Sequence, residues 1–544
     1  MTDWQEHLII GPIVLPMVIA AAMLLFDERR RLLKGGLSLF AMAAILAMAL
    51  ALLHESATGA TGGGDTARVY QLGDWPAPFG VVLVADRLST LMVALTSVLG
   101  ACSMIFALAR WDRAGPRFHA LFLLLVMGVN GAFLTGDLFN LFVFFEIMLA
   151  ASYGLALHGS GEARIRAGLA YIAVNLTASM LFLIGVSLIY GVTGTLNMAD
   201  LAVRIPQIAE ADRGLFHVGA AVLGVAFLTK CAMWPLGFWL TTTYSAASAP
   251  AAAVFAILSK VGAYVIIRLS FLLFAPDSGA SAGFGQLWIL LGGLATIGFG
   301  TAGMIAARDL SIAAAYAVIV SSGTVLAVVG IGNADVLGGA VFYLVGSTLA
   351  CGALFMLAEV LNRGQDPGAR SGRAVFEDEY IDPFDDEERN EPGLVIPAAV
   401  AALGGAFLIS TLMIAGLPPL AGFIGKLAMM DALSGVGGWA GYTVIAALSL
   451  ASLGALIGLT RLGMAALAKD YTLQQAQRDQ ANQIRQRAQA ILLQISQEKN
   501  LLYAKVGSYR AVASHLEQLE RQLRSSMPQH VMDMLGQQAA HLSR

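Results

Sequence analysis

Residues 138–149 read LFNLFVFFEIML, and Glu146 is the single charged side chain in this run. Its neighbours are aromatic or aliphatic. An ionisable side chain inside an apolar helix raises the free energy of the folded protein by a few kcal/mol or more, so one that is present is a candidate functional group. The run therefore predicts a membrane-spanning helix that carries a functional acid. A structural ion pair that locks two helices together is the alternative role for Glu146.

The composition indicates that most of the 544 residues also belong to membrane-spanning structure. Hydrophobic residues make up 57% of the chain and charged residues 13%, against about a quarter charged in soluble proteins. This excludes a multidomain soluble enzyme, and it excludes disorder for most of the chain. The net charge of −3 and the lack of a basic stripe argue against nucleic-acid binding. We predict an all-α polytopic protein whose first partner is the lipid bilayer.

Sequence motifs for cofactors are missing. The three cysteines lie far apart in apolar runs, without the spacing of metal ligands, and fit simple helix packing. The sequence has no haem, iron–sulfur, zinc or phosphate-binding motif. We therefore predict no cofactor and no metal site.

A bilayer core of about 30 Å needs roughly 20 apolar residues per helix. By this length criterion the sequence predicts thirteen spans, at residues 7–26, 36–53, 80–109, 117–135, 137–157, 165–191, 215–241, 250–274, 286–306, 309–331, 335–362, 394–435 and 438–465. Alternate loops carry most of the arginines and lysines. The positive-inside rule then predicts a multi-pass protein with its N-terminus outside.

The polar segments divide the predicted protein further. We expect an N-terminal three-helix segment at 1–116, helical repeats at 117–274 and 286–465, and a polar, Gln-rich helical tail at 466–544. The loop 363–393 is strongly acidic, which is typical of a solvated segment or of a docking site for a partner subunit. A seven-residue apolar repeat in the tail predicts a helical hairpin or a weak coiled coil.

Lys230 lies in the seventh predicted span, five residues before Pro235. A proline inside a helix removes one backbone hydrogen bond and clashes with the preceding turn. Unwound backbone at membrane depth persists only where it is buried in protein or lines a wet cavity. We expect helix seven to break beside Lys230. Snorkelling toward the interface is the alternative role for this lysine.

Two further lysines lie inside apolar spans. Lys260 lies near the middle of the eighth span, and Arg268, two turns later, is expected to be an interfacial anchor. Lys426 follows residues 416–425, which read GLPPLAGFIG. Two prolines and three glycines cannot continue a regular helix, so helix twelve should also break beside its lysine. Snorkelling is again the alternative for Lys426.

Broken helices at matching places in two halves of a transporter indicate its ion path. Helices seven and twelve are five spans apart, which predicts two inverted five-helix blocks. One glutamate and three lysines favour a proton relay over a cation cage, because lysine donates hydrogen bonds and accepts none. A Na⁺ or K⁺ site would need several oxygens, for which the sequence offers Asp137, Asn140, Ser321, Ser322, Ser347 and Thr348.

These motifs resemble a known family, the antiporter-like membrane subunits that respiratory complex I shares with Mrp-type cation/proton antiporters. The resemblance rests on the run that ends at Glu146, on TKCAMWPL (residues 229–236), on SKVGAY (259–264) and on GLPPLAGFIGK (416–426). It covers roughly residues 1–465. LTGDLFNLFVFFE (134–146) and FYLVGSTLA (342–350) are most similar to the D-type subunits of Mrp-type (Mnh/Pha) multisubunit monovalent cation/proton antiporters.

The resemblance implies fourteen spans, two inverted five-helix repeats and a proton route along the middle of the membrane. It implies that Glu146 pairs with Lys230, that Lys260 relays protons centrally and that Lys426 ends the route. Here a polar tail follows residue 465, where the family has its fourteenth helix. The complex I relatives carry histidines before the eighth span. Residues 241–250 hold none, which favours the Mrp-type branch.

The sequence thus predicts a secondary-transporter subunit rather than an enzyme. It would work in a bacterial plasma membrane with the other subunits of an Mrp-type complex and exchange protons for Na⁺ or K⁺, driven by the proton motive force. Two alternatives stay open. The chain could be a proton-pumping membrane subunit of a complex I-like NADH:quinone oxidoreductase, or an assembly subunit whose buried charges are structural.

Overall fold

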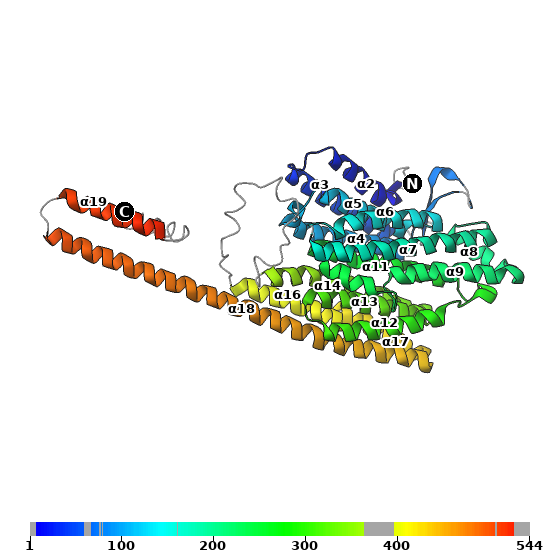
Figure 1. Ribbon diagram of the computed structural model, residues 1–544. Helices are drawn as coiled ribbons and strands as arrows, with labels where there is room; N and C mark the ends of the chain where they lie inside the picture. The colour runs from blue at the N-terminus through cyan, green and yellow to red at the C-terminus, as the bar shows by residue number, and fades with distance from the viewer. Residues whose placement is uncertain are drawn as a thin grey trace. The chain divides into compact units, whose positions relative to one another are not determined.

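A computed structural model describes residues 7–58, 67–75, 78, 80–159, 161–363, 397–505 and 509–526. These residues form two compact units, 1–467 and 468–544. In the first unit, apolar helices run side by side in alternating directions (Figure 1). The structure thus confirms the prediction of an all-α membrane protein.

The elements follow one another along the chain with short connections. The α-helices are α2 (Gly11–Leu24), α3 (Arg31–Thr58), α4 (Arg87–Leu108), α5 (Phe118–Leu134), α6 (Leu138–Ala156), α7 (Glu162–Thr193), α8 (Met198–Arg204), α9 (Glu210–Lys230), α10 (Phe238–Ala246), α11 (Ala249–Leu272), α12 (Gln286–Ala306), α13 (Leu310–Val329), α14 (Ala334–Arg363), α16 (Pro397–Ala415), α17 (Ala421–Val436), α18 (Gly438–Lys505) and α19 (Tyr509–Ser526). The short 3₁₀ turns are η1 (His7–Ile9), η2 (Leu72–Asp74), η3 (Trp111–Arg113), η4 (Ile205–Gln207) and η5 (Gly279–Ser281).

Among the described residues, ten helices are long and apolar enough to cross a membrane. Three shorter apolar helices fall within α2, α5 and α16. Each of the thirteen predicted spans overlaps one of these apolar helices. The acidic loop predicted at 363–393 lies outside the described residues except for its first residue.

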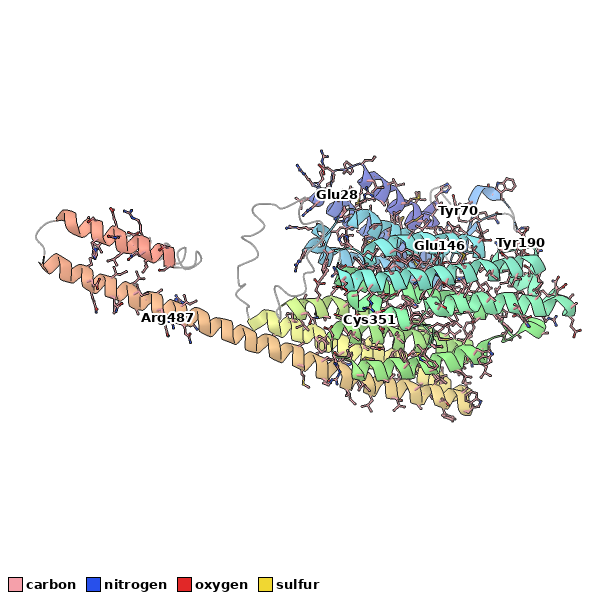
Figure 2. The ribbon with its side chains drawn as sticks, in the orientation of Figure 1. Glu28, Tyr70, Glu146, Tyr190, Cys351 and Arg487 are labelled. Atoms are coloured by element: carbon pink, nitrogen blue, oxygen red, sulfur yellow. The ribbon has the colours of Figure 1, made fainter. Side chains whose placement is uncertain are left out.

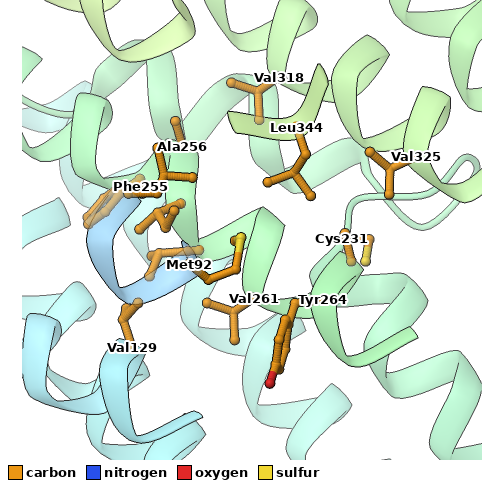
Figure 3. Close-up of a cluster of buried hydrophobic side chains, with 14 of the residues drawn as sticks. Met92, Val129, Cys231, Phe255, Ala256, Val261, Tyr264, Val318, Val325 and Leu344 are labelled. Carbon is orange, nitrogen blue, oxygen red and sulfur yellow. The ribbon is translucent and has the colours of Figure 1, made fainter. Parts of the chain in front are cut away.

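Helix α11 is the centre of the first unit. It contacts α4, α5, α6, α8, α9, α10, α13 and α14. Its apolar span is buried along its whole length, and most of the α13 span is buried as well. Helices that are apolar on every side are typical of such central positions. Figure 3 shows part of this core, with Phe255 and Val261 of α11 among side chains from other helices. Lys260 is therefore carried by the most enclosed helix of the unit.

A small antiparallel ribbon precedes α4 and was not predicted. Strand β1 (Arg68–Gln71) pairs with β2 (Val82–Ala85). The apolar residues of β2 read, in the sequence, as the start of the third span. The helix instead begins after Asp86, whose carboxylate accepts the Ser89 N–H while the Ser89 hydroxyl accepts the Asp86 N–H. This capping box fixes the start of α4 at Arg87.

The second unit, described as far as residue 526, consists of the last part of α18 and of α19. Ile484, Ala488 and Ile495 are less exposed than their neighbours on α18. Leu516, Leu519 and Leu523 form the corresponding stripe on α19. The apolar repeat predicted for the tail thus falls on two helices, each with one less exposed side.

Candidate functional site

The first helix break lies between α9 and α10, and Lys230 is the last residue of α9. The Met233 N–H donates to the Leu228 carbonyl (3.0 Å), one residue beyond the α-helical pattern. Ala232 adopts a left-handed φ of 58°. A Cβ on Gly237 would collide with the Ala232 carbonyl oxygen, so the return of the chain past the break requires glycine there.

Lys230 is buried, with 4% of its surface exposed. Its Nζ lies 5.0 Å from the centre of the Phe145 ring, a cation–π contact. Within the described part of the chain, this nitrogen has no hydrogen-bond partner. A cavity with room for about one water lies beside it, lined also by Tyr171, Asn175 and Trp239. The lysine therefore meets an aromatic face and a small space in place of a fixed acceptor.

Glu146 follows Phe145 on α6 (Figure 2). Its Oε1 is buried and has no hydrogen-bond partner among the described residues. No ion pair joins it to Lys230 among the described residues. The electrostatic pairing implied by the family resemblance stays a prediction, and Phe145 is the residue that contacts the ammonium.

Lys260 is fully buried and has two acceptors on α13. Its Nζ donates to the Val318 carbonyl (3.3 Å) and to the Ser322 hydroxyl (3.0 Å). The adjacent Ser321 shares a hydrogen bond with Ser347 of α14 (2.7 Å). Hydroxyl groups therefore extend from the central lysine toward α14, and α14 packs against α17.

Lys426 donates to three oxygens. Its Nζ contacts the carbonyls of Ile414 (3.1 Å) and Ala415 (3.0 Å) and the Ser452 hydroxyl of α18 (2.8 Å). The two carbonyls belong to the last residues of α16, where helical carbonyls lack N–H partners and the helix dipole is negative. The nitrogen also lies 5.7 Å from the centre of the Tyr343 ring. An ammonium is well matched to this helix end.

The second helix break, between α16 and α17, is closed in the same way as the first. The Leu417 N–H donates to the Leu412 carbonyl (3.0 Å), and Gly416 has a left-handed φ of 72°. A Cβ on Gly422 would collide with the Met413 carbonyl oxygen. Each break therefore uses one left-handed residue and one glycine at a close backbone approach.

The four predicted site residues lie on α6, α9, α11 and α17, and each is wholly or partly buried. No hydrogen bond or ion pair joins any two of them among the described residues. Their contacts with other side chains are new: Phe145, Tyr343 and Ser452 were not predicted. The sequence offered Ser321, Ser322 and Ser347 only as oxygen donors for a cation.

Arg268, which the sequence suggested as an interfacial anchor, is held by two side chains. Its Nη2 donates to the Asp86 carboxylate (2.8 Å) and its Nε to the Tyr264 hydroxyl (2.8 Å). Asp86 caps α4, so this contact was invisible to any argument based on α11 alone.

Comparison with known proteins places these residues in a family. The family described as "NADH:quinone oxidoreductase/Mrp antiporter, TM" matches residues 135–453, which include all four site residues. The chain belongs to this family. It is a multi-pass membrane protein, and the resemblance predicted from the sequence motifs is confirmed.

Individual relatives are named as D-type antiporter subunits. The chain is 52% identical over 472 residues to a probable K⁺/H⁺ antiporter subunit of this type from Rhizobium meliloti, covering 85% of this chain and 87% of the relative. It is 36% identical over 431 residues to the corresponding Na⁺/H⁺ antiporter subunit of Alkalihalophilus pseudofirmus, covering 78% and 80%. It also resembles a chain of the Mrp complex from Dietzia sp. DQ12-45-1b, with a TM-score of 0.71, 28% identity and coverage of 85% and 80%.

Proposed function

We propose that this chain is the proton-translocating subunit of a hetero-oligomeric Na⁺/H⁺ or K⁺/H⁺ antiporter driven by the proton motive force. The names of its relatives support this proposal, and both cations occur among those names. The other subunits of an Mrp-type complex would be its partners. It would lie in a bacterial plasma membrane with its N-terminus outside, as the loop charges indicate.

The main observation behind the proposal is a set of three buried lysines. Lys230, Lys260 and Lys426 are each at most 4% exposed, and all lie in the segment that the family match covers. Structural lysines at such depth are rare, because burying an ammonium is costly. A set of three on separate helices favours proton transfer over packing.

The first step is an exchange between Glu146 and Lys230. An ionised Glu146 attracts the Lys230 ammonium, which has no hydrogen-bond acceptor of its own in the described structure. A proton that arrives on Glu146 removes that attraction. Lys230 then releases its proton more readily, and the neighbouring cavity has room for about one water, which could receive it.

The later steps follow the hydroxyl groups. A proton on Lys260 can be shared with Ser322, whose neighbour Ser321 is hydrogen-bonded to α14. Lys426 would end the route, because the open carbonyls of α16 stabilise its charged form. The route consists of side chains of this chain and one water, and it requires no cofactor.

The two helix breaks support an architecture of two inverted five-helix repeats, 117–274 and 286–465. Both breaks are closed by the same hydrogen-bond pattern. An N-terminal segment at 1–116 and the polar tail at 466–544 would flank the repeats. The acidic loop 363–393 would connect elements of the second repeat.

The test is cation-induced proton movement in everted vesicles from a host that lacks other antiporters and expresses the whole operon. ATP hydrolysis should energise the vesicles, so that quinone chemistry plays no part. Wild type and Glu146→Gln are compared at matched complex abundance. Glu162→Gln is the control, because Glu162 is an exposed glutamate at the start of α7.

We expect Na⁺ or K⁺ to collapse the pH gradient in wild type and in the control, but not in Glu146→Gln. A wild type that responds only with NADH and quinone would instead make the chain a pump subunit of a redox complex. If Glu146→Gln lowers complex abundance and leaves the flux per complex unchanged, the buried charges are structural.

A further inference from the structure

A cluster of polar groups closes one end of α11, where α4 begins and α5 ends. Tyr264 is 1% exposed, and its hydroxyl donates to the Phe133 carbonyl at the end of α5 (2.6 Å). The same hydroxyl accepts a hydrogen bond from Arg268 Nε (2.8 Å). Arg268 also pairs with Asp86, at 2.8 Å. Figure 3 shows Tyr264 among the buried hydrophobic side chains of the core.

This cluster lies directly along α11 from the central lysine. Lys260, Tyr264 and Arg268 follow one another at intervals of four residues, so they share one face of the helix. Arg268 is roughly 12 Å along the helix axis from Lys260, at about 1.5 Å per residue. A proton that left Lys260 toward this end of α11 would meet Tyr264 and then Arg268.

The hydrogen bonds in this cluster cannot pass a proton onward. The Tyr264 hydroxyl gives its hydrogen to a backbone carbonyl, which has no hydrogen to release in turn. The hydroxyl accepts from a guanidinium, which keeps its protons at any ordinary pH. The hydrogen bonds therefore end at the Phe133 carbonyl on one side, and on the other side the Arg268 guanidinium separates Tyr264 from the Asp86 carboxylate, which is the acid of the cluster.

The arrangement of charges in the cluster also opposes the passage of a proton. Arg268 faces the buried tyrosine, while its counter-ion Asp86 is the more exposed partner, with side chains 14% and 27% exposed. A proton approaching from Lys260 therefore meets the positive side of the pair first. Fixed arginines exclude protons and cations from narrow pathways in this way.

We propose that Arg268, held by Asp86 and Tyr264, is a fixed-charge barrier that prevents protons on Lys260 from escaping at this end of α11. The proposal rests on the proton route described under the proposed function. In the orientation predicted from the loop charges, this end of α11 faces outside. The barrier would keep proton movement coupled to the exchanged cation.

The test measures proton leak instead of transport. Everted vesicles are energised with ATP in a buffer that contains choline as its cation, the ATPase is then inhibited, and the decay of the pH gradient is followed. Arg268→Gln removes the charge. Arg268→Gln combined with Asp86→Asn removes both charges but keeps two groups that can hydrogen-bond. The control is Arg204→Gln, since Arg204 forms a comparable pair with Asp200 (3.0 Å) on α8.

We expect the gradient to decay several-fold faster in the single and the double variant at matched abundance, and at the wild-type rate in the control. Adding Lys260→Ala to the double variant should restore slow decay. The proposal is overturned if the double variant retains the gradient as wild type does, if it fails to assemble, or if its leak persists without Lys260. This readout contains no exchangeable cation, so it is independent of the outcome for Glu146→Gln.

Discussion

At the scale of single residues, the three buried lysines have three different kinds of partner. Lys230 meets an aromatic face, Lys260 meets a carbonyl and a hydroxyl, and Lys426 meets the open end of a helix. The three ammonium groups are therefore surrounded by different chemical groups, although each lies in an apolar helix.

Ser452 is the most specific of these partners. Ser452→Ala removes one of three oxygens around Lys426 Nζ, and a hydrogen bond to a charged group contributes about 1.5–3 kcal/mol. We expect normal assembly, because two carbonyls remain. Cation-induced proton movement should slow by several-fold. The control is Ser449→Ala, an exposed serine on the same helix, which should transport like wild type.

His158 makes the stability of the protein sensitive to acid. It lies in the loop after α6, where Nε2 donates to the Trp111 carbonyl (2.9 Å). Burial lowers the pKa of His158 from its ordinary value of 6.5, and the Arg164 charge lowers it further. Below pH 6.5 the unfolded chain therefore binds more protons than the folded one, so stability falls as the pH falls.

We expect the thermal midpoint of the solubilised complex to decrease on acidification below pH 6.5, and His158→Asn to flatten that decrease. Well above pH 6.5 the imidazole is neutral in both states, and there this group should add no slope. A wild type and a variant with parallel pH profiles would contradict this assignment.

At the scale of elements, the two helix breaks share one design but differ in one residue. The left-handed position is alanine in the first break and glycine in the second, with φ of 58° at Ala232 and 72° at Gly416. A left-handed conformation raises the free energy of a non-glycine residue by roughly 1–2 kcal/mol. The first break thus contains strain that the second avoids.

Exchanging the residue types tests this difference. Gly416→Ala should destabilise the protein by about 1–2 kcal/mol from backbone strain alone. Its Cβ would also press on Lys426, whose Cδ lies 2.6 Å from that position. Ala232→Gly should change stability by less than about 1 kcal/mol, because relief of strain offsets the added freedom of the unfolded chain. Thermal midpoints of the two variants, measured side by side, should differ accordingly, and equal midpoints would argue against the strain.

The sequence predicted the helices better than it predicted their contacts. Long apolar runs and loop charges define spans by simple physics, and prolines beside Lys230 and Lys426 mark disruption of a helix. The β-ribbon was missed because residues 82–85 are apolar and continuous with the helix that follows. The roles of Phe145, Ser452 and Asp86 depend on contacts between segments that are far apart in the sequence. No local sequence pattern predicts such contacts.

At the scale of the whole molecule, the first unit is built around α11. This helix contacts eight other helices, and its apolar span is buried throughout. The central lysine and the proposed barrier both lie on it. Every proposed transport residue belongs to this unit, and the family match ends at residue 453.

The tail should therefore be dispensable for transport. A chain that ends at Leu467 contains the complete first unit. We expect it to assemble and to give cation-induced proton movement comparable to that of the full chain in the vesicle assay. Loss of flux with normal assembly would mean that residues 468–544 contribute to the activity, and loss of assembly would assign them a role in the complex.

The small cavity beside Lys230 has a kinetic consequence. The cavity has room for about one water, so in the proposed route proton transfer at this lysine would depend on whether that single molecule is present. Transport should then carry a solvent deuterium isotope effect and respond to osmotic stress, because both act on the supply and mobility of internal water. In the proposed route, the occupancy of this one water site would then limit the rate of proton transfer.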